Sequence, residues 1–80
     1  MDNILYLSDI TPGEIVFINE IKLQGPIRRR MQDIGLVKNT RVKCVGSSPL
    51  GDPKAFLIRG AVIAIRSEDC KNIFVTPFRV

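Results

Sequence analysis

The chain contains no histidine, and this absence removes several of the commonest tools of enzymes. Neither a Ser-His-Asp triad nor a Cys-His pair can form, and the usual general base and imidazole metal ligand are missing. Glycine-rich phosphate-binding motifs of the GxxxxGKS/T or GxGxxG type are absent as well. Only Glu68 and Asp69 adjoin among the carboxylates, at the start of an expected helix, where the helix dipole accounts for them. We therefore predict that the chain is not an enzyme and needs no cofactor.

Cysteine is scarce, because Cys44 and Cys70 are the only two in the chain. No CxxC pair is present, so a structural zinc site lacks its usual ligand spacing. Cys44 lies in an apolar strand pattern and Cys70 in a short helical pattern. The simpler interpretation is two buried or half-buried thiols, since a disulfide framework is not expected in a protein without an export signal. A metal-binding pair is the alternative.

Long hydrophobic runs are missing too. The longest uncharged apolar stretch, residues 61–65, has the length of a strand, whereas a membrane span needs about 18 to 20 residues. The first six residues begin acidic and show neither the basic region nor the cleavage site of a signal peptide. We therefore expect a cytoplasmic protein.

Length and charge limit what the chain can be. Its 80 residues are expected to form a single domain, residues 1–80, with a thin core and little room for an internal active site. A hydrophobic content of 45% is ordinary for a globular domain. The net charge of +4 suits an acidic partner, which could be nucleic acid, a membrane surface or an acidic protein.

The pattern of apolar and turn residues predicts a mainly β fold of about five short strands with one or two short helices. A short capped turn and a tight turn are expected over residues 8–13. The strands are expected over residues 14–21, 40–45, 54–59, 61–66 and 73–75, and the helices over 26–34 and 68–72, the second capped by Ser67. A sheet of so few strands would leave its unpaired edge strands exposed. We therefore expect it to close into a small barrel, because closure removes the sheet edges.

The helix expected over residues 26–34 carries one narrow apolar stripe. Ile27, Met31 and Ile34 follow one another at i, i+4 and i+7, which places them on one face toward the core. Gly35 is the expected left-handed cap, and Leu36 beyond it can fold back onto the stripe.

Three consecutive arginines, residues 28–30, lie within that helix. Arg29 points away from the apolar stripe and is expected to pair with Asp33 one turn later. Arg28 and Arg30 flank the stripe. Their stems either cover apolar surface or their charged heads grip an acidic partner.

A proline-stiffened loop carries an apolar residue at its tip. Leu50 lies between Pro49 and the Gly51-Asp52-Pro53 sequence, whereas turn tips are normally polar. Leu50 is therefore either folded over the barrel mouth or exposed as an anchor for a partner. The candidate partner-binding residues are Pro49, Leu50, Asp52, Arg28 and Arg30.

Several segments, in matching order and spacing, resemble the FeoA family. Residues 25–36, GPIRRRMQDIGL, resemble its G-x-x-x-R-R-L-x-x-L-G-L helix, and residues 48–53, SPLGDP, resemble its P-L-G-D-P loop. Residues 59–66 resemble R-G-x-x-(L/I)-A-(L/I)-R, and residues 73–75 resemble the terminal I-x-V. The opening residues 7–14 fit as well. The resemblance thus covers nearly the whole chain.

The resemblance has two departures. Lys38-Asn39 stands where the family usually has Pro-Gly after the helix, and Asn39 can take the positive φ that such a turn needs. The core match ends at residue 75, so the tail, residues 76–80, stays unassigned.

The resemblance implies an SH3-like barrel, similar to the C-terminal domain of iron-dependent repressors. It also implies a small non-catalytic cytosolic accessory of ferrous iron uptake that binds and modulates the FeoB-type permease, which carries a GTPase domain. The membrane would then be met only through the permease, and self-association stays open. The family is associated with transition metal ions, but the scattered carboxylates and missing histidine assign no metal ligand here.

Two other functions compete with this one. A small basic barrel could bind nucleic acid through Arg28 and Arg30, but aromatic residues are few and offer no stacking platform, so we do not expect it. A transition-metal carrier could hand iron to the permease, but only the two cysteines offer soft ligands.

Overall fold

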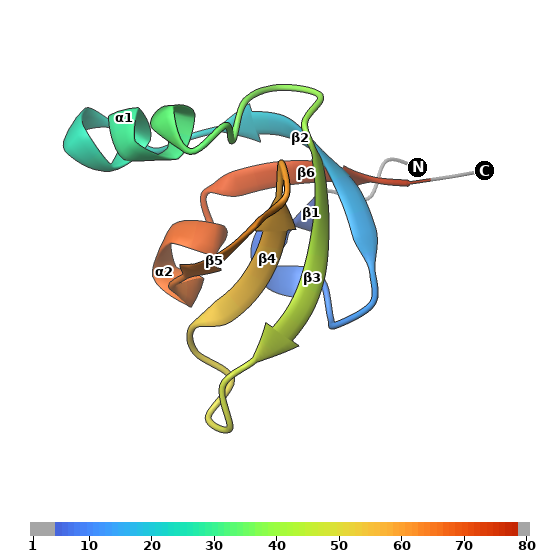
Figure 1. Cartoon of the computed structure of the whole chain (residues 1–80). Helices are drawn as coiled ribbons and strands as arrows, with labels where there is room; N and C mark the ends of the chain where they lie inside the picture. Colours follow the sequence, from blue (N-terminus) through green and yellow to red (C-terminus); the bar gives the residue numbers. More distant parts are fainter. Residues whose placement is uncertain (1–4, 79–80) are drawn as a thin grey trace.

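Six antiparallel strands form one strongly curled sheet around the core (Figure 1). The computed structural model describes residues 5–78. The strand order is β1-β6-β2-β3-β4-β5. In chain order the elements are β1 (Leu5–Tyr6), the 3-10 helix η1 (Leu7–Asp9), β2 (Ile15–Ile21), α1 (Gly25–Asp33), β3 (Arg41–Ser47), β4 (Lys54–Ile58), β5 (Ala61–Ile65), α2 (Ser67–Cys70) and β6 (Ile73–Pro77). The mainly β prediction is confirmed.

The core lies inside the curl of the sheet and follows the two-residue period of the strands. In β3, Val42 and Cys44 point inward while Arg41 and Lys43 point outward, as the sequence predicts. In β4, Phe56 and Ile58 point inward. The remaining fully buried large side chains come from η1, β2, β5, α2, β6 and two connecting segments: Leu7, Ile10, Val16, Ile18, Leu36, Ile65, Cys70 and Ile73.

The first strand was not predicted, so the sheet has six strands instead of about five. Leu5 pairs with Val75 and Tyr6 with Phe74, and the Tyr6 and Phe74 rings meet edge to face at 4.7 Å between centroids. A strand of two residues has no periodicity that a sequence pattern can reveal.

Residues 76 and 77 of the tail take part in the sheet. Thr76 and Pro77 extend β6 beside β2, and the ring of Phe78 lies 5.6 Å from that of Phe17. The described part of the unassigned tail is therefore structural, whereas residues 79 and 80 lie outside the described residues.

The turn between β4 and β5 is tighter than the bulge or corner predicted at Gly60. Ile58 pairs with Ala61, so the loop contains only Arg59 and Gly60. Their φ angles of 50° and 84° are both positive, as a two-residue hairpin turn with the right twist requires.

The helix α1 packs as predicted, with its apolar stripe against the core. Met31 is buried, and Ile27 and Ile34 are half-buried against the core. Gly35 has a φ of +94°, and the N–H of Leu36 donates to the Met31 carbonyl at 2.9 Å, which closes the helix end.

The predicted Arg29–Asp33 ion pair is wrong. Among residues 5–78, the ion pairs are Lys22–Glu20 and Arg66–Glu68, both on the surface. An exposed i, i+4 pair is worth only a few tenths of a kcal/mol, about what is needed to hold two long side chains in place.

Candidate functional site

The loop between β3 and β4 presents Leu50 to solvent. Leu50 is 94% exposed, so the arrangement in which it folds over the barrel mouth is wrong. The Ser48 hydroxyl donates to the Asp52 carbonyl and accepts from the Asp52 N–H, and the Gly51 N–H donates to the Ser48 carbonyl at 2.8 Å. These bonds fix the backbone of the loop, so the apolar side chain stands on an ordered tip.

Asp52 connects this loop to the helix α2. Its carboxylate oxygen Oδ1 accepts the Ser67 N–H at 2.9 Å, at the first residue of α2. The prediction that Ser67 itself caps the helix is therefore wrong, because Arg66 holds the cap position and Asp52 supplies the acceptor from across the fold. Pro49 stays exposed beside Leu50.

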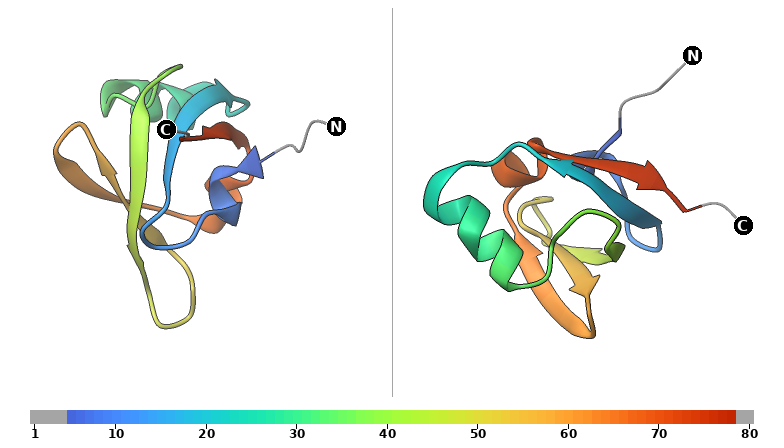
Figure 2. Two further views of the ribbon diagram at one scale, coloured as in Figure 1. Left: turned by 90° about the vertical axis from the view of Figure 1, so that its right-hand side faces the viewer. Right: turned by 90° about the horizontal axis from the view of Figure 1, so that it is seen from above.

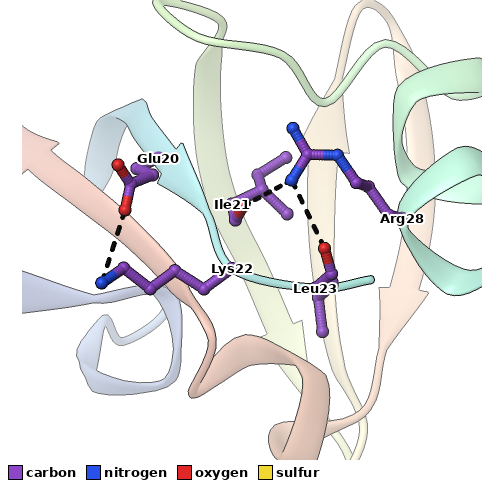
Figure 3. A network of polar contacts seen from close by, with 5 residues as sticks. All are labelled: Glu20, Ile21, Lys22, Leu23 and Arg28. Atoms are coloured by element: carbon purple, nitrogen blue, oxygen red, sulfur yellow. Dashed lines mark hydrogen bonds and ion pairs between the residues drawn. The ribbon is translucent and has the colours of Figure 1, made fainter. Parts of the chain in front are cut away.

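Arg28 is also engaged within the fold. Its Nη1 atom donates to the Ile21 carbonyl at 2.9 Å and to the Leu23 carbonyl at 3.3 Å, which ties α1 to the end of β2 (Figure 3). Figure 3 also shows the neighbouring Glu20–Lys22 pair. Of the two arginines that flank the apolar stripe, Arg28 thus stabilises the fold through these hydrogen bonds.

Arg30 lines a cleft between α1 and the β5–α2 corner. The cleft has a volume of about 490 Å³. Ile27, Met31 and Ile63 give it an apolar lining, and Arg66 stands at the same cleft. The β5 side of this cleft was not predicted from the sequence, although the uncharged run over residues 61–65 was the available signal.

The predicted candidates do not form one site. The β3–β4 loop with Leu50 and the helix α1 lie at opposite ends of the molecule in Figure 1 and in the left view of Figure 2. A partner could use either end, but only the loop end offers a fully exposed large apolar side chain among residues 5–78.

Both thiols belong to the core. Cys44 and Cys70 are free and fully buried, and the Cys70 Sγ–H donates to the Ile65 carbonyl at 3.8 Å. Burial raises the pKa of Cys70 to about 12. Within residues 5–78, no group of three or more His, Cys, Asp or Glu side chains is placed to hold a metal ion. Neither thiol is therefore placed to act as an exposed metal ligand.

Folding is expected to depend on neither metal nor oxidation. Thermal melts recorded with a chelator, and separately with a reductant, should overlay the untreated melt, because both thiols are free and residues 5–78 hold no ligand cluster. A fall of more than a few degrees with the chelator would reveal a structural metal site.

The buried Cys70 thiol predicts a loss of stability in alkali. In the unfolded chain this thiol ionises near the ordinary cysteine pKa of 9.0, whereas burial raises the pKa of the folded thiol to about 12. The unfolded state then binds fewer protons, so the free energy of unfolding falls as pH rises across this window. Denaturant unfolding at several pH values should show a steeper fall for the natural chain than for Cys70→Ala; parallel curves would contradict this assignment.

Comparison with known proteins identifies relatives. The family model for the FeoA domain matches residues 5–77. The FeoA protein of Chlorobium tepidum is 27% identical, with a TM-score of 0.89 over 94% of this chain and 71% of that chain. A FeoA-like protein of Clostridium acetobutylicum is 28% identical, with a TM-score of 0.86 over 100% of this chain and 93% of that chain. Among curated proteins, none matches the chain significantly.

A third structure identifies the fold class. FeoA of Stenotrophomonas maltophilia, solved with zinc, is 23% identical, with a TM-score of 0.77 over 89% of this chain and 88% of that chain. It is described as a prokaryotic SH3 domain protein and a candidate activating factor of ferrous iron transport. The predicted SH3-like architecture is confirmed.

Proposed function

Because the chain belongs to the FeoA family of ferrous iron transport proteins, we propose that it is a cytoplasmic, non-catalytic accessory that binds and modulates the FeoB-type permease. The observation that carries this proposal is the full exposure of Leu50 on an ordered loop tip. An apolar side chain in that position gains almost no free energy from folding and is available to contact a partner, where its burial would be favourable.

The ordered loop favours binding at low entropic cost. The hydrogen bonds of Ser48 with Asp52 and of Asp52 with Ser67 hold the loop before any partner arrives. Pre-organisation of this kind improves affinity because less chain must be ordered on binding. We propose that Leu50 and Pro49 contact the partner while Asp52 holds the loop in place.

The permease is a membrane protein, and the chain is proposed to meet the membrane only through it. In residues 5–78, no helix has the length and apolar character that crossing a bilayer requires. The metal-carrier alternative gains no support, since both cysteine thiols are buried.

The proposal is tested by iron uptake in cells. Deleting the gene for this chain should lower the uptake of radioactive ferrous iron at an unchanged level of permease, and reintroducing the natural chain should restore uptake. Undiminished uptake in the deletion strain, with the permease as the only ferrous importer present, would contradict the proposal.

The chain alone is expected to hydrolyse neither GTP nor ATP. Its sequence has no phosphate cradle, and residues 5–78 contain no cluster of acidic ligands for Mg²⁺, which such hydrolysis requires. Phosphate release should stay at the background of a buffer control. Turnover that persists through a second, independent purification would contradict this expectation.

A further inference from the structure

One pocket is lined by four basic residues and no acidic one. Lys38, Arg41, Lys43 and Arg59 line a pocket of about 420 Å³, together with Asn39, Thr40, Leu57 and Gly60, and none of its lining residues is acidic. The chain has 12 lysines and arginines and 8 acidic residues, so its other eight cations are matched in number by its carboxylates. Four of the chain's 12 lysines and arginines thus surround one pocket.

The fold brings these cations together without neutralising them. The ion pairs among residues 5–78 involve none of the four. Val42 pairs with Ile58, and Arg41 and Arg59 are the residues next to this pair, Arg41 at the start of β3 and Arg59 in the turn after β4. Within the fold, the Arg41 guanidinium carbon lies 5.9 Å from the centre of the Phe78 ring, a cation–π contact that leaves the positive charge in place.

The stem of Arg59 packs against the backbone of Gly35. Its Cδ atom lies so close to Gly35 that a Cβ added there would be only 2.5 Å away. Arg59 also has a positive φ of 50°, imposed by the two-residue turn. The turn and this close contact thus place Arg59 beside the end of α1.

Apolar side chains continue the pocket across the sheet. Lys43 pairs with Leu57, and Leu57 pairs with Val62, so the three form one row across β3, β4 and β5. Leu57 is 37% exposed and Val62 66% exposed. Cations beside exposed aliphatic groups suit a ligand that carries both carboxylates and aliphatic side chains.

We propose that this pocket binds an acidic, leucine-type segment of a partner protein. Carboxylates of the segment contact Arg41, Lys43 and Arg59, and its aliphatic side chains cover Leu57 and Val62. A protein segment fits better than nucleic acid, because a single-stranded nucleic acid needs a longer basic track with aromatic stacking surfaces, and no aromatic residue lines the pocket. The pocket lies at the opposite end of the β3–β4 hairpin from Leu50, so this proposal does not depend on the loop.

The test is an NMR titration of the full, isotope-labelled chain with an eight-residue capped peptide of alternating glutamate and leucine. Millimolar binding is measurable in this way. We expect the backbone amide shifts of residues 38–43 and 57–60 to move and the affinity to fall as salt is raised. The double variant Arg41→Gln, Lys43→Gln should weaken binding about tenfold or more. The control Arg29→Gln, Lys71→Gln removes the same charge elsewhere and should change affinity less than about twofold.

The proposal would be overturned by no binding, by shifts confined to other residues, or by equal effects of the two double variants. A titration with an eight-nucleotide uridine oligomer completes the design. If the oligomer binds this pocket more tightly than the peptide, the pocket is a nucleic-acid site and the protein-segment proposal is wrong. Melting temperatures of both double variants show whether each chain remains folded.

Discussion

Phe56→Ala is expected to lower the free energy of unfolding by about 3 to 5 kcal/mol, because it empties the largest fully buried side-chain position of a thin core. Phe56 lies in the middle of β4, paired with Cys44 on one side and Ile63 on the other. A chain of 80 residues has a total stability of only about 4 to 12 kcal/mol. Denaturant unfolding should therefore show a variant that has lost a large share of its stability.

The neighbouring residue provides the matched control. Leu57 points to the outer face and is 37% exposed, so Leu57→Ala should cost about 1 kcal/mol or less. Equal losses for the two variants, or a larger loss for Leu57→Ala, would show that the register of β4 is wrong.

Leu50→Ala is expected to weaken the association with the permease about ten- to a hundredfold while leaving the melting temperature almost unchanged. Leu50 is 94% exposed, so its truncation removes almost no contact within the chain. Burial of a leucine in a partner's pocket is worth about 1.5 to 3 kcal/mol, which corresponds to one to two factors of ten in affinity. Equilibrium binding and a thermal melt of the same preparation measure the two effects.

Val37→Ala serves as the control, since it trims another exposed aliphatic side chain, in the connection that follows α1. This variant should bind as the natural chain does. Unchanged binding by Leu50→Ala would show that the anchor lies elsewhere, and weakened self-association of Leu50→Ala alone would indicate a second copy of the chain as the partner.

Much of the fold was predictable because local patterns determine it. The alternation around Val42 and Cys44 and the i, i+4, i+7 stripe of α1 follow from strand and helix periods. Gly35 and Asn39 have the positive φ values expected of them. The extra strand β1 was not predicted because a strand of two residues is too short to show an alternating pattern.

The site was less predictable because long-range contacts decide it. Whether Leu50 is exposed or folded over the barrel depends on how the whole loop projects, which no local pattern shows. Asp52 was predicted as a contact residue, yet it caps α2 from 15 positions away in sequence.

The sequence also did not show where basic residues gather in the fold. Arg28 and Arg30 were candidate partner-binding residues because they belong to a run of three arginines in the sequence. In the structure, however, Arg28 donates hydrogen bonds to backbone carbonyls of β2 and of the segment after it. The concentrated cations come instead from β3 and two separate turns, with Arg41 and Arg59 18 positions apart along the chain. Strand pairing brings them together, and only the outward alternation of Arg41 and Lys43 was visible beforehand.

The central claim, that this chain binds the FeoB-type permease, is tested most directly by calorimetric titration of the purified chain into full-length permease in lipid nanodiscs. The permease is loaded in parallel with GDP and with a non-hydrolysable GTP analogue. We predict saturable binding in at least one nucleotide state and a weaker complex with Leu50→Ala. Absence of binding in both states, with permease that binds its nucleotides normally, would contradict the claim.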